Sequence, residues 1–188
     1  MISYLLAGAA QEPVSLAEAK AFLKVDDGAE DGLIETLIGA ARLHVEGVTG
    51  KALLNQSWRV VLDRWPENRV VRLPVSPFMS LTAINAIDEA GASHEVPLAQ
   101  FMREPDRLLL PAGVNGMPVL QERQGIEIDY VAGFGEDPED VPTDLRQALL
   151  VLVAHWHENR DAVVVAGSGA VVPLGFDRMV ATHKRVRL

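Results

Sequence analysis

The residues best suited to chemistry gather at one place, His155, His157 and Glu158. A zinc peptidase helix needs a second histidine four residues after the first, so that both imidazoles face one ion. Four residues after His157 stands Asp161. His155 and His157 are two residues apart, which points them about 200° from each other on a helix. The spacing favours a polar helix end, and a metal-dependent or small-molecule enzyme that uses these side chains stays as the alternative.

The acidic clusters and the glycine pairs of the sequence also lack the spacing of calcium-binding and phosphate-binding loops. The acidic residues of 26–31 miss the alternation of a calcium loop, and those of 136–140 are explained by an acidic turn before a helix N-terminus. The glycine pairs at 133–135 and 167–169 lack the third glycine or the Lys-Ser/Thr of a phosphate loop. No Gly-x-Ser-x-Gly elbow and no cysteine is present. We therefore expect no catalytic residue, no metal and no cofactor.

Charge is distributed unevenly along the chain. The whole sequence has 17 basic and 26 acidic residues, a net charge of -9, which would repel a nucleic-acid backbone. Residues 177–188 reverse this balance, because Asp177 is the one acid among four bases, Arg178, Lys184, Arg185 and Arg187. A basic end on an acidic body indicates a docking tail, and a solvated, frayed terminus is the other interpretation.

Composition places the chain among globular proteins. It is 48% apolar and 23% charged, close to the average of folded domains. The apolar run at 4–10 is too short to span a bilayer and has no basic leader, so we expect neither a signal peptide nor a transmembrane helix. Folding in the cytoplasm is the default expectation.

A long helix is predicted to carry the core. It runs from about Thr143 to Asn159, with Pro142 before it and Asp144 in its first turn. Apolar side chains recur at helical spacing and cover most of its circumference, which is typical of a buried helix. The residues that we expect in this core are Leu145, Leu149, Leu152, Val153 and Trp156.

Two further helices precede it, and a β region lies between. Ser15 and Glu18 form a capping box that begins a helix ending near residue 24, and a second helix runs over about 30–48. From 56 to 132 the apolar period becomes two, with Leu81, Ala83 and Ile87 expected on one face, and prolines and glycines separate short strands. A short helix is expected from Phe176 to about 183.

These elements predict an α+β fold. It is a small helical bundle of three main helices and a short C-terminal helix, with an inserted antiparallel β region. We expect one domain over 1–188, with helical parts at about 13–55 and 141–188 and the β insertion at about 56–132.

Short segments along nearly the whole chain also recur in the order and spacing of one protein family. They are PVSLAEAK at 13–20, VTGKAL at 48–53, QSW at 56–58, LDRWP at 62–66, LPVSP at 73–77, YVAGFG at 130–135, VP at 141–142, LRQA at 145–148, HW at 155–156, ENR at 158–160 and VPLG at 172–175. In these segments the sequence resembles the head-tail connector (adaptor) proteins of tailed phages and gene transfer agents. His157 departs from the family, which is expected to have an aromatic residue there.

This resemblance implies a structural protein in the neck of a phage or phage-like particle. Such proteins form a ring, usually of twelve subunits, beneath the portal of the DNA-filled head. Their partners are the portal protein and stopper or tail proteins, and DNA is only passing cargo. The basic C-terminal end of the chain then becomes a candidate for docking to the portal. The residues proposed for this contact are Phe176, Arg178, Lys184, Arg185, Arg187 and Leu188. Another neck protein, such as a stopper, stays open, although a stopper is expected to be mostly β.

Overall fold

The computed structural model describes residues 1–159 and 172–184. The chain forms two compact units: a sheet unit of Met1–Ala9 and Asn55–Phe134, and a helical unit of Ala10–Leu54 and Gly135–Leu188. Helices and antiparallel sheets occur together, which confirms the predicted α+β class. That both units act as one domain stays a prediction.

The helices of the helical unit begin and end where local sequence signals place them. Ser15 caps α1 by accepting a hydrogen bond from the Glu18 amide at 3.2 Å. Gly50 ends α2 in the left-handed conformation, at φ 70°. The described helices are α1 (Leu16–Leu23), α2 (Asp31–Thr49), α3 (Thr143–Glu158) and α5 (Phe176–Val180), with short 3-10 helices at Pro138–Asp140 and Ala181–His183. None of the described helices is long and apolar enough to cross a membrane.

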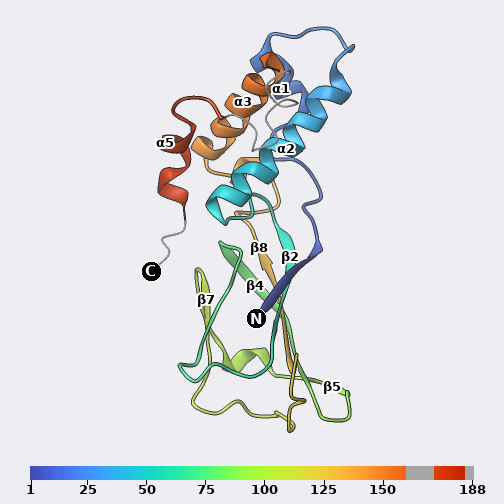
Figure 1. Cartoon of the computed structure of the whole chain (residues 1–188), viewed down its shortest axis with the longest axis vertical. Helices are drawn as coiled ribbons and strands as arrows, with labels where there is room; N and C mark the ends of the chain where they lie inside the picture. Colours follow the sequence, from blue (N-terminus) through green and yellow to red (C-terminus); the bar gives the residue numbers. More distant parts are fainter. Residues whose placement is uncertain (160–171, 185–188) are drawn as a thin grey trace. The chain divides into compact units, whose positions relative to one another are not determined.

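Helices α2 and α3 lie side by side and form the core of this unit (Figure 1). The buried stripe of α2 consists of Ile34, Ile38, Ala41 and Val45. From α3 come all five residues of the predicted core, each at most 5% exposed: Leu145, Leu149, Leu152, Val153 and Trp156. Burying one such side chain stabilises a fold by roughly 1.5–3 kcal/mol. Helices α1 and α5 also contact α3.

The sheet unit contains two antiparallel sheets. In the larger one the strand order is β1-β2-β8-β4-β5, and in the smaller one it is β3-β7-β6. Their strands are β1 (Ile2–Ala7), β2 (Gln56–Leu62), β3 (Val70–Arg72), β4 (Phe78–Ile87), β5 (Ser93–Glu95), β6 (Met102–Glu104), β7 (Arg107–Leu109) and β8 (Ile126–Ala132). Strand β1 lies far from the others in sequence, and its residues were not among the predicted strands. Its pairing with β2 makes it an edge of the larger sheet.

The two faces of the larger sheet differ in polarity. On one face Val60, Ile128 and Tyr130 are completely buried. On the other, Arg59 forms two hydrogen bonds to the Asp129 carboxylate, at 2.6 and 2.7 Å, and an ion pair with Glu127 at 2.7 Å. The hydrogen bonds to Asp129 raise the pKa of Arg59 above its usual range. These contacts hold β2 and β8 in one register, because a one-residue slip would turn the charges toward the core.

The predicted alternation in β4 is wrong. Leu81 pairs with Tyr130 on the buried face, whereas Ala83 pairs with Asp129 on the polar face. A register irregularity between Leu81 and Ala83 shifts the phase, so that Ile84 and Ala86 are the completely buried residues further along the strand. A bulge adds one residue to one strand of a pair, so the residues after it point to the opposite face. Alternation in the sequence alone does not predict where this change occurs.

An acidic turn leads from β8 into α3. The Asp137 amide donates a hydrogen bond to the Asp140 carboxylate at 3.1 Å, and the Gln11 side chain donates to the Glu136 carbonyl at 2.9 Å. A Cβ atom at Gly135 would overlap Oδ2 of Asp140 and lie 2.5 Å from its Cβ. Position 135 must therefore be glycine, because the Asp140 side chain lies against its Cα. The acidic residue Asp140 stabilises the turn through its hydrogen bond with the Asp137 amide.

Tyr130→Phe tests the buried hydroxyl, which accepts a hydrogen bond from the Val75 amide at 3.2 Å. We expect the free energy of unfolding to fall by about 1–2 kcal/mol, because the amide loses this acceptor. Tyr4→Phe, at the exposed strand β1, is the matched control: it removes a side-chain hydrogen bond with Arg59 that water can replace, so stability should change by less than about 0.5 kcal/mol. Chemical denaturation measures both, and equal effects would contradict the assignment.

Gly135→Ala tests the close approach in the acidic turn. Because Asp140 Cβ itself stands in the way, we expect a loss of about 1–3 kcal/mol in the free energy of unfolding. Gly47→Ala is the control, since Gly47 lies within α2 with open space around it. That change should be neutral or stabilise by up to about 1 kcal/mol. A stability of Gly135→Ala equal to that of the unmodified protein would refute the steric argument.

Candidate docking site

The C-terminal segment 176–184 is packed on the helical unit. Phe176 and Val180 of α5 are buried, at 1% and 0% exposure. The Phe176 ring lies 5.4 Å from the ring of His44, and His44 contacts Trp156 edge-on at 5.8 Å. His183 lies 2.7 Å from the Asp144 carboxylate at the start of α3. The interpretation as a frayed terminus therefore does not hold for this segment.

The structure sorts the predicted docking residues into different roles. Phe176 is a correction, because a ring buried against His44 anchors the segment and is not available to a partner. Arg178 is exposed. Lys184 is also exposed and forms an ion pair with Asp177 at 2.7 Å. The remaining three, Arg185, Arg187 and Leu188, lie outside the described residues.

One exposed apolar residue near this segment is not among the predicted docking residues. Leu174 is fully exposed, directly before α5. It stands between Pro173 and Gly175, and Gly175 has a positive φ of 95°. The signal in the sequence is a leucine between two residues that break regular structure, where no helical face can bury it. Leu174 and Arg178 are thus the described residues of this segment best placed to meet a partner.

The histidines at the end of α3 do not converge. His157 lies 2.7 Å from the Glu30 carboxylate at the start of α2, and the ring of His155 faces Asn159 at 3.4 Å. Within residues 1–159 and 172–184, no three His, Asp or Glu side chains come together as a metal site would require. The geometry gives no support to the alternative of an enzyme that uses His155, His157 and Glu158.

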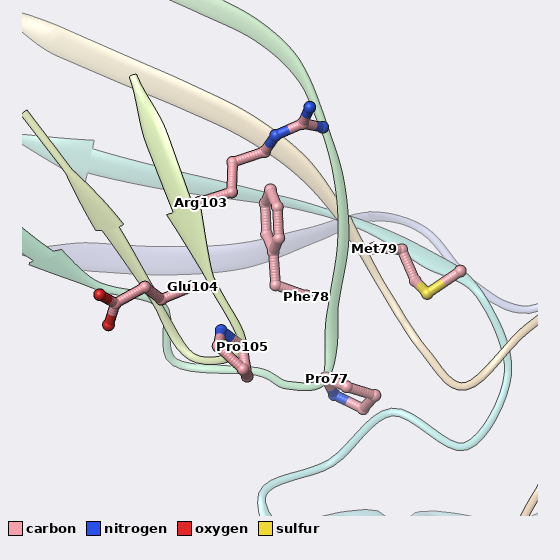
Figure 2. Close-up of a pocket in the computed structure, with 6 residues that line it drawn as sticks. All are labelled: Pro77, Phe78, Met79, Arg103, Glu104 and Pro105. Atoms are coloured by element: carbon pink, nitrogen blue, oxygen red, sulfur yellow. The ribbon is translucent and has the colours of Figure 1, made fainter.

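A pocket of about 320 Å³ opens in the sheet unit, beside the start of β4. It is lined by Pro77, Phe78, Met79, Arg103, Glu104 and Pro105. In Figure 2 the Phe78 ring points toward the Arg103 side chain, while Met79 points away from both. Apart from Arg103 and Glu104 the lining side chains are apolar, and no nucleophile stands beside a base. We call this site the β4 pocket.

His44, which contacts the Phe176 ring, should make the free energy of unfolding depend on pH. Burial lowers the pKa of His44 below its usual value, and Asp177 opposes that shift. The unfolded chain then binds the proton more readily, so this contribution to stability is present above about pH 6.5 and is lost as the pH falls. We expect His44→Gln to unfold with a weaker pH dependence than the unmodified protein between about pH 6.5 and 5. Thermal denaturation across this range measures it, with pH 8 as the reference, and parallel curves would contradict the assignment.

Known proteins resemble this chain over part or all of its length. Residues 13–88 match the family model of the Phage gp6-like head-tail connector protein. No curated protein matches the sequence significantly. Among solved structures, a chain from the neck of an empty gene transfer agent (GTA) particle, computed with C6 symmetry, is 28% identical with a TM-score of 0.81. The alignment covers 100% of this chain and 97% of that one.

Two further structures agree with the first. A chain from the virion of a native gene transfer agent particle is 28% identical with a TM-score of 0.82, and one from the neck of a native GTA particle, computed with C12 symmetry, is 26% identical with a TM-score of 0.75. Both alignments cover 100% of this chain and 97% of the other. They confirm the resemblance seen in the sequence: the chain is similar over residues 13–88 to the head-tail connector family, and over its whole length to neck proteins of gene transfer agents.

Proposed function

We propose that this chain is a structural adaptor subunit in the neck of a phage or phage-like particle, where it joins the DNA-filled head to the tail. The observation that carries this function is the similarity of the whole chain, and not of one unit only, to proteins of gene transfer agent necks. Catalysis is not needed for this role, and the polar clusters of the described residues are used in helix and turn contacts. A stopper is disfavoured because helices α2 and α3 form a substantial core.

In the particle, copies of the chain form a closed ring. The neck structures similar to it were computed with C6 and with C12 symmetry. A ring of twelve satisfies both, because every twelve-fold arrangement is also six-fold. Cyclic symmetry requires a heterologous contact, in which one surface of a subunit meets a different surface of the next. The two units then act together as one adaptor domain, with the helices as a small bundle and the sheets as its insertion.

The negative net charge of the chain suits a ring through which DNA passes. The chain carries a net charge of -9, and twelve such subunits would repel the phosphate backbone from the channel wall. DNA then moves as cargo and is not bound.

The C-terminal segment 176–188, together with Leu174 shortly before it, is the proposed contact with the portal. Its anchor, Phe176, holds α5 on the helical unit, so that Leu174 and Arg178 are presented on a packed element. A ready-made surface loses less conformational entropy on binding than an unfolded tail. Residues 185–188 add two bases and a leucine to the same end of the chain.

Removal of the gene tests the neck function directly. We expect DNA-filled heads and separate tails, because the ring that connects them is missing. Electron microscopy of the lysate and mass spectrometry of purified particles measure this outcome. Tailed particles at normal yield without the protein would overturn the proposed function.

Leu174→Asp tests the portal contact. We expect purified heads to lose the protein, because a carboxylate replaces an exposed apolar contact. Leu43→Asp, at another exposed leucine, 63% exposed on α2, is the matched control and should leave incorporation unchanged. Circular dichroism of both purified variants checks the fold. Full incorporation of Leu174→Asp would refute the contact but would leave the neck function standing.

A further inference from the structure

The larger sheet has an open edge of unusual composition. Strand β1 pairs with β2 on one side, and no described strand pairs with its other side. Edge strands are usually protected from pairing by charged residues or proline. The sequence of β1, ISYLLA, contains neither. Four large apolar side chains are between 43% and 54% exposed: Ile2, Tyr4, Leu5 and Leu6. This edge therefore has both the free backbone groups and the apolar surface for pairing with another strand.

The opposite side of the same sheet is open over part of its length. Strand β5 pairs with β4 only from Asn85 to Ile87, and the Val96 amide donates to the Ile84 carbonyl. At the start of β4, the Phe78 amide donates to the Pro105 carbonyl. In the described residues, no strand pairs with the side of β4 away from β8 between Met79 and Ala83. The β4 pocket adjoins this open stretch and offers it an apolar lining.

We infer that strand β1 of one copy pairs with the open stretch of β4, between Met79 and Ala83, in the neighbouring copy of the ring. This inference rests on the proposed function, which supplies a second copy beside every subunit. The larger sheets of successive subunits would then join edge to edge around the ring.

Strand directions support this pairing. Each of the steps from β1 to β2, β8 and β4 is antiparallel, so β1 and β4 run in opposite directions. In the proposed pairing the ring axis lies along the strands, and rotation about such an axis keeps their directions. The β1 strand of the next copy therefore runs antiparallel to β4, and the alternation continues without a break. Antiparallel addition to an edge is a common mode of recognition through backbone hydrogen bonds.

Side chains fit the same arrangement. Leu5 is on the sheet face of Trp58, Tyr130 and Leu81, and Phe78 stacks on Tyr130. In the added strand, Leu5 would therefore lie on the face of Phe78 and Leu81. Tyr4 pairs with Arg59, so it is on the polar face, which also carries Ser80. An uncharged strand brings no unpaired charge to a pocket whose only charged side chains are Arg103 and Glu104.

A different pairing would give a different assembly. If β1 paired with β1 of another copy, the contact would be two-fold and would close as a dimer. A strand from a tail protein would leave the copies of this chain unconnected through this edge. Cross-linking distinguishes the three cases.

The test uses paired cysteines, since the natural sequence contains none. Purified particles that carry Tyr4→Cys with Ser80→Cys, or Ile2→Cys with Ser80→Cys, are oxidised and analysed on a denaturing gel without reductant. These pairs are on one face of the joined sheet, and two register positions are covered. We expect at least one pair to give a ladder of covalent multimers. Leu5→Cys with Ser80→Cys is the matched control on opposite faces and should give none.

Several results would overturn the inference. The first is that both same-face pairs give only monomers in particles that contain the protein. The second is that the control pair gives a ladder equal to that of the same-face pairs. The third is that the single variant Tyr4→Cys gives dimers, which would indicate pairing of β1 with β1. Absence of the unmodified protein from particles would instead refute the proposed function.

Hydrogen exchange of the unmodified protein provides a second measurement that needs no variant. The amides of residues 2–7 and 79–83 should exchange more slowly in the particle than in the free chain, and unchanged exchange in both segments would also refute the pairing.

Discussion

The pairing of β2 with β8 is the constraint on which the rest of the chain depends. Gln56 pairs with Ala132, and Leu62 pairs with Ile126. The first residues of the β insertion and its last residues are therefore neighbours. Since the insertion returns to the point where it began, α2 and α3 can pack as one core although the whole insertion separates them in sequence. Closing such a long loop costs entropy, which grows only slowly with length, and the buried face of β2 and β8 offsets it.

Arg59 makes this pairing specific. A sheet with one apolar face could in principle slip, but a slip of β2 by one residue would bury the Arg59 guanidinium and expose Val60. The two hydrogen bonds to Asp129 favour one register over the others, although an ion pair with partly exposed groups adds little to total stability. Apolar burial thus supplies the stability of the sheet, and the charged cluster determines its register.

Local signals explain what the sequence predicted well. The Ser15 cap, the glycine after α2 and the apolar spacing of α3 all act within a few residues, and the structure contains each of them. Of the predicted capping box, Ser15 supplies its half, whereas the Glu18 carboxylate accepts a hydrogen bond from Arg146 at 2.7 Å. The misses are not local. Strand β1 gains its structure from β2, more than fifty residues away, and the phase of β4 depends on a register irregularity against β8. Phe176 was assigned to docking because of its place near a basic tail, and its burial depends on His44 in a distant helix.

Charge limits how the subunits of an acidic ring can hold together. Neighbouring copies with a net charge of -9 repel one another, and salt screens this repulsion only beyond roughly 8–10 Å. A contact that placed acidic surfaces together would add to the repulsion at short range, where screening is weak. Backbone pairing through an uncharged strand avoids this cost, because its hydrogen bonds and apolar side chains are independent of net charge. An acidic channel for DNA and a stable ring are therefore compatible if the subunits meet through strands such as β1, and the absence of charge from ISYLLA is then a requirement of assembly.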